Sequence, residues 1–376
     1  MNIGFDAKRI VRNNTGLGSY GRTLVNDLAE IVPPDTRLCL YAPDEGLEQL
    51  RRQVTPRPSI RFCYPQGNAP KWYWRSKQIV DDLKRDRIQL FHGLSGELPI
   101  GIGRSGIKSV VTIHDLIFLR HPEYYKWFDR KVYEWKFRKT IQEADRIVAI
   151  SECTKRDIML LGSVPAEKID LIYQSCSTFF KLRESEDKLQ DVNARYMLPA
   201  RYIVSVGTIE ERKNILLAVK ALHRLPADLS LVIVGRPTPY TDYVKHYVEE
   251  NRLGDRVLML HNVPNADLPS IYQMAEACVY PSRYEGFGIP VIEAIQSGLP
   301  VVACKGSCLE EAGGNDSIYV DPDDVVGMAE AVASVLKGAE GRDLRVARAQ
   351  KYIQRFEGND VASQMLDVYR QLVPGL

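Results

Sequence analysis

The feature that most constrains the fold is a repeated alternation of short β-rich runs with stretches of helical pattern. Apolar runs bounded by Gly, Pro or Asp are typical of strands buried on both faces of a parallel sheet, because the intervening helices cover those faces. Seven runs come first and six follow: residues 3–6, 37–42, 60–64, 88–92, 109–114, 146–151 and 168–173, then 202–207, 229–235, 257–261, 277–281, 300–304 and 317–320. The predicted fold class is therefore α/β, with two doubly wound, Rossmann-like domains.

The polar stretch 181–193 lies between the two sets of runs and is the expected linker. At 376 residues the chain also exceeds the usual size of a single hydrophobic core. We expect an N-terminal domain over 1–182, a C-terminal domain over 183–351 and a closing helical segment over 352–376. Open α/β sheets bind ligands beyond the carboxyl ends of their strands. The expected active site is therefore a cleft across which the two domains face each other.

Two carboxylates eight positions apart, Glu285 and Glu293, flank a glycine turn that leads into a helix near Pro290. The N-terminus of a helix binds phosphate or pyrophosphate through backbone N–H groups. Glu293 is placed to reach ribose hydroxyls, and Glu285 to face whatever hangs from the distal phosphate. The alternative is an ordinary glycine turn with one helix carboxylate stabilised by the dipole. The backbone groups expected at a phosphate are those of Gly286, Phe287, Gly288 and Ile289.

Two adjacent cations, Arg212 and Lys213, follow the first strand expected in the second domain. Lys supplies a compact charge and Arg a bidentate fork, and both suit phosphate. Charges on a loop can also be merely solvated. In the first domain, His114 closes the run 109–114 where residues of the cleft belong, and His92 is a weaker candidate of the same kind. The alternative for both is a structural histidine.

The pattern Gly-x-Gly-x-x-Gly at residues 16–21 is similar to a dinucleotide fingerprint. The fingerprint needs its first glycine directly after a strand, whereas this one comes ten residues after the run 3–6. We therefore expect Gly16 and Gly18 to let the backbone approach a different ligand, with a helix starting near Tyr20. NAD(P) is not expected.

The segment Asp321-Pro322-Asp323 has the form of a metal-diphosphate motif. It follows the last predicted strand, where Asp323 suits a helix N-cap, and we interpret it as structural. No other cluster of carboxylates or histidines has metal spacing. Neither a metal nor an organic cofactor is expected.

Charge is divided unequally along the chain. Residues 1–182 contain 29 Lys/Arg and 21 Asp/Glu, or +8, and the remainder contains 21 and 27, or −6. The runs 71–77 and 120–139 combine basic residues with aromatics. Such a mixture suits an anionic membrane surface or a polyisoprenoid phosphate. The alternative is a helix with an aromatic core face and a solvated basic face. No nucleic-acid partner is expected.

These motifs together resemble the family 4 retaining glycosyltransferases of the GT-B fold, over nearly the whole chain. The resemblance rests on residues 16–18, 114–115, 207–214 and 285–302. It implies that the second domain binds a nucleotide sugar and the first an acceptor. By motif, Glu293 should contact the ribose and Glu285 the donor hexose. Arg212 and Lys213, with the backbone of 286–289, should hold the diphosphate.

The resemblance also assigns roles outside the glycine turn. It places His114 at the reacting sugar, with Gly16 and Gly18 closing over it, and the nucleotide base near Arg236 and Val263. Two departures leave open questions. Many members carry Arg directly after the glycine that corresponds to Gly207, where this chain has Thr208, so Arg212 is the expected substitute. The run 172–176 lacks a glycine that members usually have.

The function expected from this resemblance is metal-independent transfer of a hexose with retention, as in bacterial mannosyltransferases of surface-glycan assembly. GDP-mannose is the preferred donor because residues 207–214 resemble the mannosyltransferase branch, and a UDP-sugar is the first alternative. The acceptor is expected to be a glycan or a lipid-linked saccharide. A GT-B epimerase or phosphorylase, and a non-catalytic nucleotide-sugar-binding protein, stay open as rival functions. An N-terminus that begins as a strand, and unpaired cysteines, favour the cytoplasm, with peripheral contact at the inner face of the cytoplasmic membrane.

Overall fold

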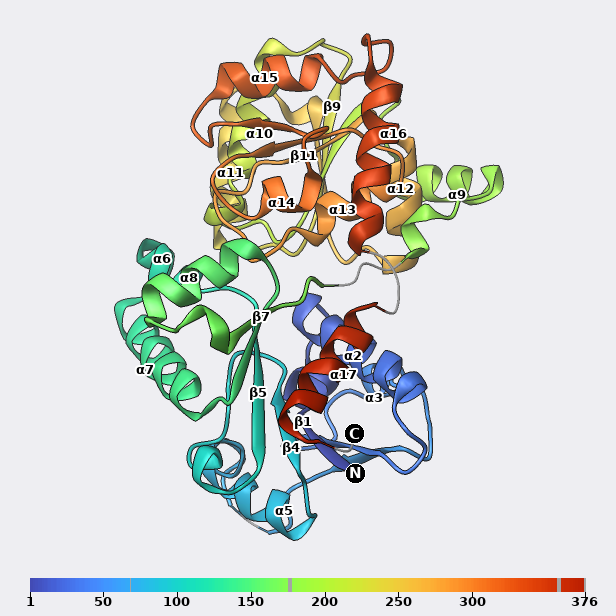
Figure 1. The fold of residues 1–376 in the computed structure, drawn as a ribbon. Helices are drawn as coiled ribbons and strands as arrows, with labels where there is room; N and C mark the ends of the chain where they lie inside the picture. The colour runs from blue at the N-terminus through green and yellow to red at the C-terminus, as the bar shows by residue number, and fades with distance from the viewer. Residues whose placement is uncertain (68, 175–177, 357–359, 375–376) are drawn as a thin grey trace. The chain divides into compact units, whose positions relative to one another are not determined.

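The computed structural model describes residues 1–67, 69–174, 178–356 and 360–374. The chain divides into two compact units, which we call unit 1 (Met1–Ser175 with Gly358–Leu376) and unit 2 (Cys176–Glu357) (Figure 1). Each unit contains one parallel sheet with helices on both faces, so the predicted α/β class with two doubly wound domains is confirmed. The binding roles expected of residues 1–182, 183–351 and 352–376 stay predictions.

Unit 1 is built on a seven-stranded sheet in the order β3-β2-β1-β4-β5-β6-β7, with every neighbouring pair parallel. Its strands are β1 (Asn2–Asp6), β2 (Arg37–Tyr41), β3 (Ile60–Cys63), β4 (Leu90–Gly93), β5 (Lys108–Ile113), β6 (Arg146–Ala149) and β7 (Ile169–Leu171). Alternate residues of a strand enter cores on opposite faces. In β2, Leu38 and Leu40 belong to one buried cluster and Cys39 and Tyr41 to the other. Burial on both faces explains why the sequence shows continuous apolar runs.

The helices of unit 1 share these two cores. Helices α1, α2 and α17 contribute to the cluster of Leu38, and α5, α7 and α8 to the cluster of Tyr41. Helix α17 comes from the end of the chain and packs against α2. The helices are α1 (Lys8–Arg12), α2 (Gly16–Ile31), α3 (Glu48–Arg51), α4 (Lys71–Tyr73), α5 (Ile79–Arg85), α6 (Ile117–Arg120), α7 (Trp127–Glu143), α8 (Glu152–Gly162) and α17 (Asp360–Leu372), with a π-helix at Trp74–Gln78.

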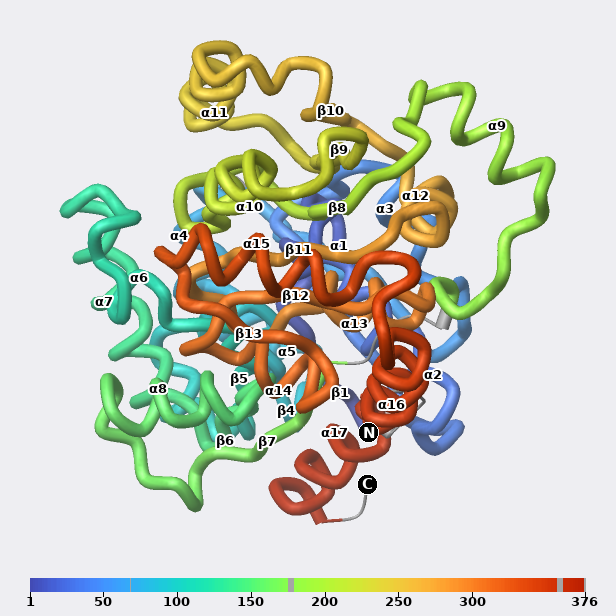
Figure 2. Tube along the Cα trace, turned by 90° about the horizontal axis from the view of Figure 1, so that it is seen from above, coloured from blue at the N-terminus to red at the C-terminus, as the bar shows by residue number. Residues whose placement is uncertain are grey.

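Unit 2 contains a six-stranded parallel sheet in the order β10-β9-β8-β11-β12-β13, which Figure 2 shows as successive strands across the unit. Its strands are β8 (Tyr202–Val206), β9 (Ser230–Val234), β10 (Val257–Leu260), β11 (Ala277–Tyr280), β12 (Val301–Cys304) and β13 (Ile318–Val320). Each of the thirteen strands in the described residues overlaps a run predicted from the sequence. A short apolar run was a sufficient signal even for edge strands such as β10 and β13, which are mostly half-buried.

The helices of unit 2 also cover both faces of its sheet. Helices α10, α11 and α15 share one buried cluster with the strands, while α13 packs with α14 and α16. The helices are α9 (Glu186–Tyr196), α10 (Ile215–Ala221), α11 (Pro239–Glu250), α12 (Leu268–Met274), α13 (Ile289–Gln296), α14 (Leu309–Gly313), α15 (Val325–Ala333) and α16 (Arg342–Ile353). Within the described ranges, no helix has the length and apolar character needed to cross a membrane.

Three local predictions were wrong. The expected linker 181–193 contains most of helix α9 (Glu186–Tyr196), which is anchored because Lys188 and Arg195 pair with the buried carboxylate of Asp267. The helix expected to start near Tyr20 begins at Gly16. The N-cap of α15 is Asp324, whose side chain accepts from the Gly327 N–H, whereas Asp323 pairs with Arg283. The first and third errors concern polar residues whose partners the sequence does not reveal, whereas the second is a misplaced helix start.

The order of strands creates a switch point in each unit. In unit 1 the chain moves outward from β1 to one side and from β4 to the other, and in unit 2 it does so from β8 and β11. At a switch point the loops after two adjacent strands turn in opposite directions and leave a crevice where ligands bind. Residues at the ends of β1, β4, β8 and β11 are therefore the first to consider for function.

The β8 and β9 ends of unit 2 approach each other so closely that only glycine fits at residue 235. A Cβ added to Gly235 would lie 1.8 Å from the Gly207 carbonyl oxygen. We predict that Gly235→Ala lowers the free energy of unfolding by about 1–3 kcal/mol, because backbone atoms must move apart. Thermal unfolding measures this. Gly254→Ala, whose added Cβ meets no atom within 4 Å, is the matched control. Equal melting temperatures for the two variants would contradict the prediction.

Candidate functional site

The switch point of unit 2 brings together three of the predicted residues. Lys213 and Arg212 follow β8, and Glu285 follows β11. The Glu285 carboxylate forms an ion pair with the Lys213 ammonium and lies 3.1 Å from the Arg212 guanidinium. The Ser282 hydroxyl donates to the same carboxylate at 2.6 Å. The Arg283 N–H donates to the Arg212 carbonyl at 2.9 Å, so backbone as well as charge joins the two loops.

The electrostatics of this cluster follow from burial and neighbouring charge. Burial alone would raise the pKa of Glu285, but Lys213 and Arg212 lower it to about 2. Burial would lower the pKa of Arg212, whereas the carboxylates of Glu285 and Glu210 raise it. Both groups are therefore charged at neutral pH. A polyanion that binds here meets two cations whose charge is already partly balanced.

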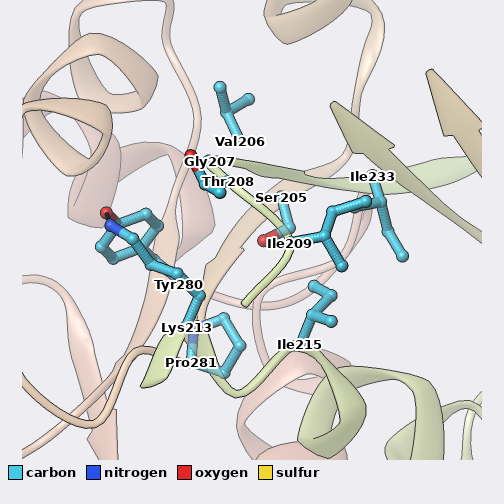
Figure 3. Close-up of a pocket in the computed structure, with 10 residues that line it drawn as sticks. All are labelled: Ser205, Val206, Gly207, Thr208, Ile209, Lys213, Ile215, Ile233, Tyr280 and Pro281. Carbon is cyan, nitrogen blue, oxygen red and sulfur yellow. Dashed lines mark hydrogen bonds between the residues drawn. The ribbon is translucent and has the colours of Figure 1, made fainter. Parts of the chain in front are cut away.

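A small hollow of about 10 Å³ lies beside the cluster. It is lined by the β8 end at Gly207 and Thr208, together with Lys213, Tyr280 and Pro281 of the neighbouring loops (Figure 3). The Lys213 ammonium donates to the Tyr280 hydroxyl at 2.7 Å and lies 5.1 Å from the centre of the Tyr280 ring. The ammonium is thus held at the crevice by Tyr280 and Glu285 and does not extend into solvent.

The glycine turn leads directly into α13, as predicted. Gly288 is the N-cap of the helix with φ of 113°, a conformation that favours glycine. Pro290 lies in the first turn, and the Phe287 ring is buried against Phe356. Ile289 begins the helix. The turn is therefore rigidly packed on one side, and a helix N-terminus follows β11 at the switch point.

Glu293 lies in the second turn of α13, whereas a helix that leads in near Pro290 predicts it in the first turn. Burial raises the pKa of its carboxyl to about 7, and the hydroxyl of Tyr272 offsets only part of this effect. Unlike Glu285, it has no cation among the described residues that lowers its pKa. Near neutral pH this carboxyl is therefore present in both protonation states, and its protonated form can donate a hydrogen bond.

The two residues predicted near the nucleotide base follow β9 and β10, on one side of the sheet of unit 2. Arg236 comes directly after β9 and its side chain is exposed, while Val263 follows β10 and is half-buried. Their loops are joined because the ring of His261 hydrogen-bonds the Gly235 carbonyl at 2.7 Å. Both residues therefore lie at the same edge of the sheet as Lys213, beyond the carboxyl ends of the strands.

In unit 1, His114 is buried at the end of β5. Its Nε2 lies 2.9 Å from the Leu94 carbonyl, which can only accept, so Nε2 carries the proton. Nδ1 then accepts from the Gln174 amide at 2.8 Å. Burial lowers the pKa of His114 to about 4, so the ring is neutral at pH 7. Gln174 lies in the run 172–176, which departs from the family pattern, and no local signal in the sequence reveals that it binds His114.

The two glycines predicted at the ligand differ in their surroundings. A Cβ on Gly18 would lie 1.8 Å from the Asn13 carbonyl oxygen, whereas a Cβ on Gly16 would meet nothing within 4 Å. Gly18 therefore allows the start of α2 to pack against the preceding loop. Gly16 is exposed at the N-terminus of the same helix and is free of that structural constraint.

The switch point of unit 1 holds an ionic cluster that sequence reasoning missed. Arg75, in the π-helix, binds Asp6 at the end of β1 and Glu97 in the loop after β4, and Lys136 donates to Glu97 at 3.2 Å. Arg75 and Lys136 hold the pKa of Glu97 at about 2, against the effect of burial. π-helical turns are frequent at functional sites, although no signal in the run 71–77 marked Arg75 as internal.

Beside this cluster lies a cavity of about 260 Å³. Its wall combines His114 and the charged pair of Glu97 and Lys136 with aromatic side chains, among them Tyr125 and Phe118. Carboxylates and aromatic faces are suited to polar ligands that also present C–H surface. The cavity therefore places the predicted His114 beside groups that can bind such a ligand.

A chain of buried polar groups runs behind His114. The Tyr369 hydroxyl of α17 lies 2.6 Å from His92, the other nitrogen of His92 lies 2.8 Å from the Thr112 hydroxyl, and the Tyr20 hydroxyl lies 3.1 Å from Thr112. The Tyr20 ring packs edge-on against His114. His92, the weaker candidate, is thus an internal histidine that connects the last helix to the wall of the cavity.

Comparisons with known proteins assign the two halves of the chain. A model described as Glycosyltransferase Family 4 matches residues 16–177, and one described as Glycosyl transferases group 1 matches residues 197–352. The chain belongs to glycosyltransferase family 4. Among its relatives are the O-antigen chain mannosyltransferase B of Escherichia coli, 26% identical over 99% of this chain and 100% of the relative, and O-antigen chain mannosyltransferase RfbU of Salmonella typhimurium, 27% identical over 93% and 94%.

Solved structures confirm the GT-B fold of this family 4 enzyme. A glycosyltransferase from Rickettsia africae has a TM-score of 0.78 at 17% identity, covering 100% of this chain and 99% of the other. The lipopolysaccharide glycosyltransferase WaaG has a TM-score of 0.72 at 14% identity, covering both chains fully. The prediction of a GT-B glycosyltransferase is thus confirmed, whereas the roles assigned to individual residues stay predictions.

The raised pKa of Glu293 predicts a pH-dependent cost to stability. The folded protein holds this proton up to about pH 7 and the unfolded chain releases it near 4.5, so stability falls as pH rises between these values. We predict that Glu293→Gln is more stable than the wild type by about 3 kcal/mol above pH 8, and that the difference vanishes near pH 4.5. Thermal unfolding at both pH values measures it. A difference that is independent of pH would contradict the raised pKa.

The chain of polar groups predicts a specific cost for losing one hydroxyl. In Tyr369→Phe the buried His92 ring loses a hydrogen-bond partner, and the free energy of unfolding should fall by about 1–3 kcal/mol. Chemical denaturation, with CD as the probe, measures this. Tyr243→Phe, at a side chain that is 57% exposed, is the matched control and should be neutral. Equal loss in both variants would refute the structural importance of the chain of polar groups.

Proposed function

We propose that the enzyme transfers mannose from GDP-mannose, with retention, to a glycan or lipid-linked saccharide acceptor. Unit 2 is assigned the donor. The observation that carries this assignment is the position of Arg212 and Lys213 beside the N-terminus of α13, at the switch point of a doubly wound sheet. Two cations and a helix N-terminus suit a diphosphate.

The proposed donor contacts divide along the glycine turn. The backbone from Gly286 to Ile289 and the two cations would hold the diphosphate. Glu293 would bind the ribose, and Glu285, which already orients Lys213, would face hydroxyls of the hexose. The base would lie near Arg236 and Val263, which follow β9 and β10 on the side of β8 away from β11.

The choice of mannose is supported by the relatives rather than by geometry. The two full-length relatives described above are named O-antigen chain mannosyltransferases, and a third, from Escherichia coli, is named a serotype-specific mannosyltransferase at 26% identity over 63% of this chain. The segment 207–214 also has the form expected of that branch. UDP-sugars are the competing donors, and the first experiment separates the two.

Unit 1 is assigned the acceptor. Its cavity presents the Glu97 carboxylate, Lys136 and aromatic rings, which suit the hydroxyls and C–H faces of a saccharide. His114 would lie at the reacting sugar. Because Leu94 and Gln174 engage both of its ring nitrogens, His114 would shape the wall instead of transferring a proton. For a lipid-linked acceptor, the enzyme would work in the cytoplasm, in peripheral contact with the inner face of the membrane.

The proposed reaction breaks the bond between the anomeric carbon and the diphosphate oxygen. The acceptor oxygen bonds to the same face of the sugar, and its proton leaves with the nucleoside diphosphate. Positive charge develops on the sugar and negative charge on the leaving diphosphate. Arg212, Lys213 and the α13 N-terminus would stabilise the latter, and preorganised groups of this kind cost no reorganisation during the reaction.

Calorimetric titration with GDP, UDP and NAD, without added metal, tests the donor assignment. Micromolar binding of GDP alone supports the proposal, and binding of UDP alone would keep the transferase and replace the donor. Binding of NAD alone would overturn the assignment of the site.

Turnover assays separate the rival functions. Conversion of donor in the absence of acceptor, beyond slow hydrolysis, would indicate an epimerase. Donor binding without turnover on any acceptor would indicate a non-catalytic binding protein.

Lys213→Ala tests the diphosphate site directly. Losing one preorganised cation should lower kcat by about 10²–10³, because the leaving group is then less stabilised. Glu293→Ala should instead weaken nucleotide binding. Steady-state kinetics and calorimetry separate the two effects. Lys245→Ala, at an exposed lysine of α11, is the control, and melting temperatures exclude unfolding as the cause. Normal kinetics in both site variants would refute the donor site.

A further inference from the structure

Helix α7 carries an exposed stripe of alternating aromatic and basic side chains. Trp127, Lys131, Trp135 and Lys139 follow one another at every fourth position, so they share one face of the helix, and Phe128 lies beside them. We call these five residues the α7 stripe. Trp127 is 67%, Phe128 70% and Trp135 52% exposed. In Figure 1 α7 lies at the periphery of unit 1.

The core of unit 1 does not account for these aromatics. Phe137 and Thr140 are the buried residues of α7, and they project from a different side of the helix. The sequence left open a helix with an aromatic core face and a separate basic face. The structure instead places two tryptophans and two lysines on the same exposed face, so that alternative is wrong for the stripe. Large apolar side chains are rarely exposed together without a partner.

The charge around the stripe is positive. From residue 126 to 143 the chain contains six Lys/Arg and three Asp/Glu, or +3. The stripe itself contains two charged residues, Lys131 and Lys139, and both are positive. Glu134 lies at its edge and is occupied by Arg138 at 3.0 Å and Lys131 at 3.5 Å. A partner that binds this face must therefore bury the indole rings in an apolar environment and present negative charge beside them to the lysines.

We propose that the α7 stripe docks the enzyme on an anionic phospholipid membrane. Tryptophan prefers the level of the headgroups, where its ring is buried and its N–H stays wet, and lysines that flank it meet the lipid phosphates. A surface helix with this composition lies in the plane of the interface. The inference deepens the proposed function, since it gives the enzyme access to a lipid-linked acceptor in the same membrane.

The other aromatic and basic run, 71–77, contributes less to this surface. Trp74 is buried and donates to Asp82 at 2.7 Å, and Arg75 belongs to the internal ionic cluster. Trp72, at 74% exposed, is the main outward group of that run. Since Glu97 bridges Arg75 and Lys136, the run and α7 lie on either side of one ion-pair cluster. The proposal rests on α7 alone.

Co-sedimentation with vesicles tests the proposal without donor or acceptor, so its outcome is independent of the transferase assay. The probes are vesicles of phosphatidylcholine with one third phosphatidylglycerol, and vesicles of phosphatidylcholine alone. We expect the wild type to bind the anionic vesicles, to bind about tenfold or more weakly when salt rises from about 0.05 to 0.5 M, and not to bind the neutral ones. Its tryptophan fluorescence should shift to the blue on binding.

Matched variants identify the surface. Lys131→Gln with Lys139→Gln should weaken binding on the order of 30-fold, since each lysine near an anionic surface contributes about fivefold. Trp127→Ser with Trp135→Ser should abolish the fluorescence shift. Lys245→Gln with Lys351→Gln removes two exposed lysines of unit 2 and should bind as the wild type does.

Any of three results would overturn the proposal: the wild type does not bind the anionic vesicles, it binds neutral vesicles equally well, or the stripe and control variants lose equal amounts of vesicle binding. Binding that requires a small fraction of polyisoprenyl phosphate in neutral vesicles, and not phosphatidylglycerol, would replace the membrane surface with a specific lipid phosphate. GDP binding measured on the same variants tests the donor site separately.

Discussion

In each unit of this enzyme, a half-buried arginine connects the loops that follow two adjacent central strands. Arg75 connects the end of β1 to the loop after β4, and Arg212 connects the loop after β8 to that after β11. Both bridges cross the switch point of a doubly wound sheet, where the loops diverge beyond the last hydrogen bonds of the strand ladder. In unit 2 the hydrogen bond from the Arg283 N–H to the Arg212 carbonyl supports the bridge. A guanidinium can donate to both sides at once, which a lysine cannot do with fixed geometry. The diverging loops thus leave a crevice for a ligand, and the arginine keeps the two loops that line it in fixed positions.

The two bridges contain equal numbers of positive and negative groups but arrange them differently. In unit 1 Arg75 faces two carboxylates, Asp6 and Glu97, and Lys136 compensates only the second. In unit 2 Glu285 lies between two cations, Arg212 and Lys213, and Glu210 pairs with Arg212 from the other side. The first arrangement offers acceptor oxygens to hydroxyls, and the second offers cations to phosphates. This difference follows from which residue type stands at each strand end, and it supports the assignment of saccharide to unit 1 and nucleotide sugar to unit 2.

The sequence predicts what depends on local pattern and fails where a partner lies far along the chain. The thirteen strands of the described residues and the turn into α13 were predicted, because short apolar runs and a Gly-Pro helix start are local signals. Arg212, Lys213 and Glu285 were predicted separately, but their contact spans 72 residues and depends on β8 lying beside β11. The interior position of Arg75 and the pairing of Gln174 with His114 were missed for the same reason. Helix α9 was missed because its sequence has little apolar periodicity. Ion pairs to Asp267 hold it in place instead.

The two carboxylates that flank the glycine turn are not equivalent. Two cations hold the pKa of Glu285 at about 2, while burial without a cation raises that of Glu293 to about 7. Environments that separate two pKa values in this way commonly separate two roles. In the proposed donor site the anion of Glu285, which orients Lys213, would accept hydrogen bonds from sugar hydroxyls. A second fixed anion near the diphosphate would repel it, whereas a protonated Glu293 would bind a ribose hydroxyl without that penalty. The arriving diphosphate, being negative, would further favour the protonated form, so the donor itself would complete the charge state that its site requires.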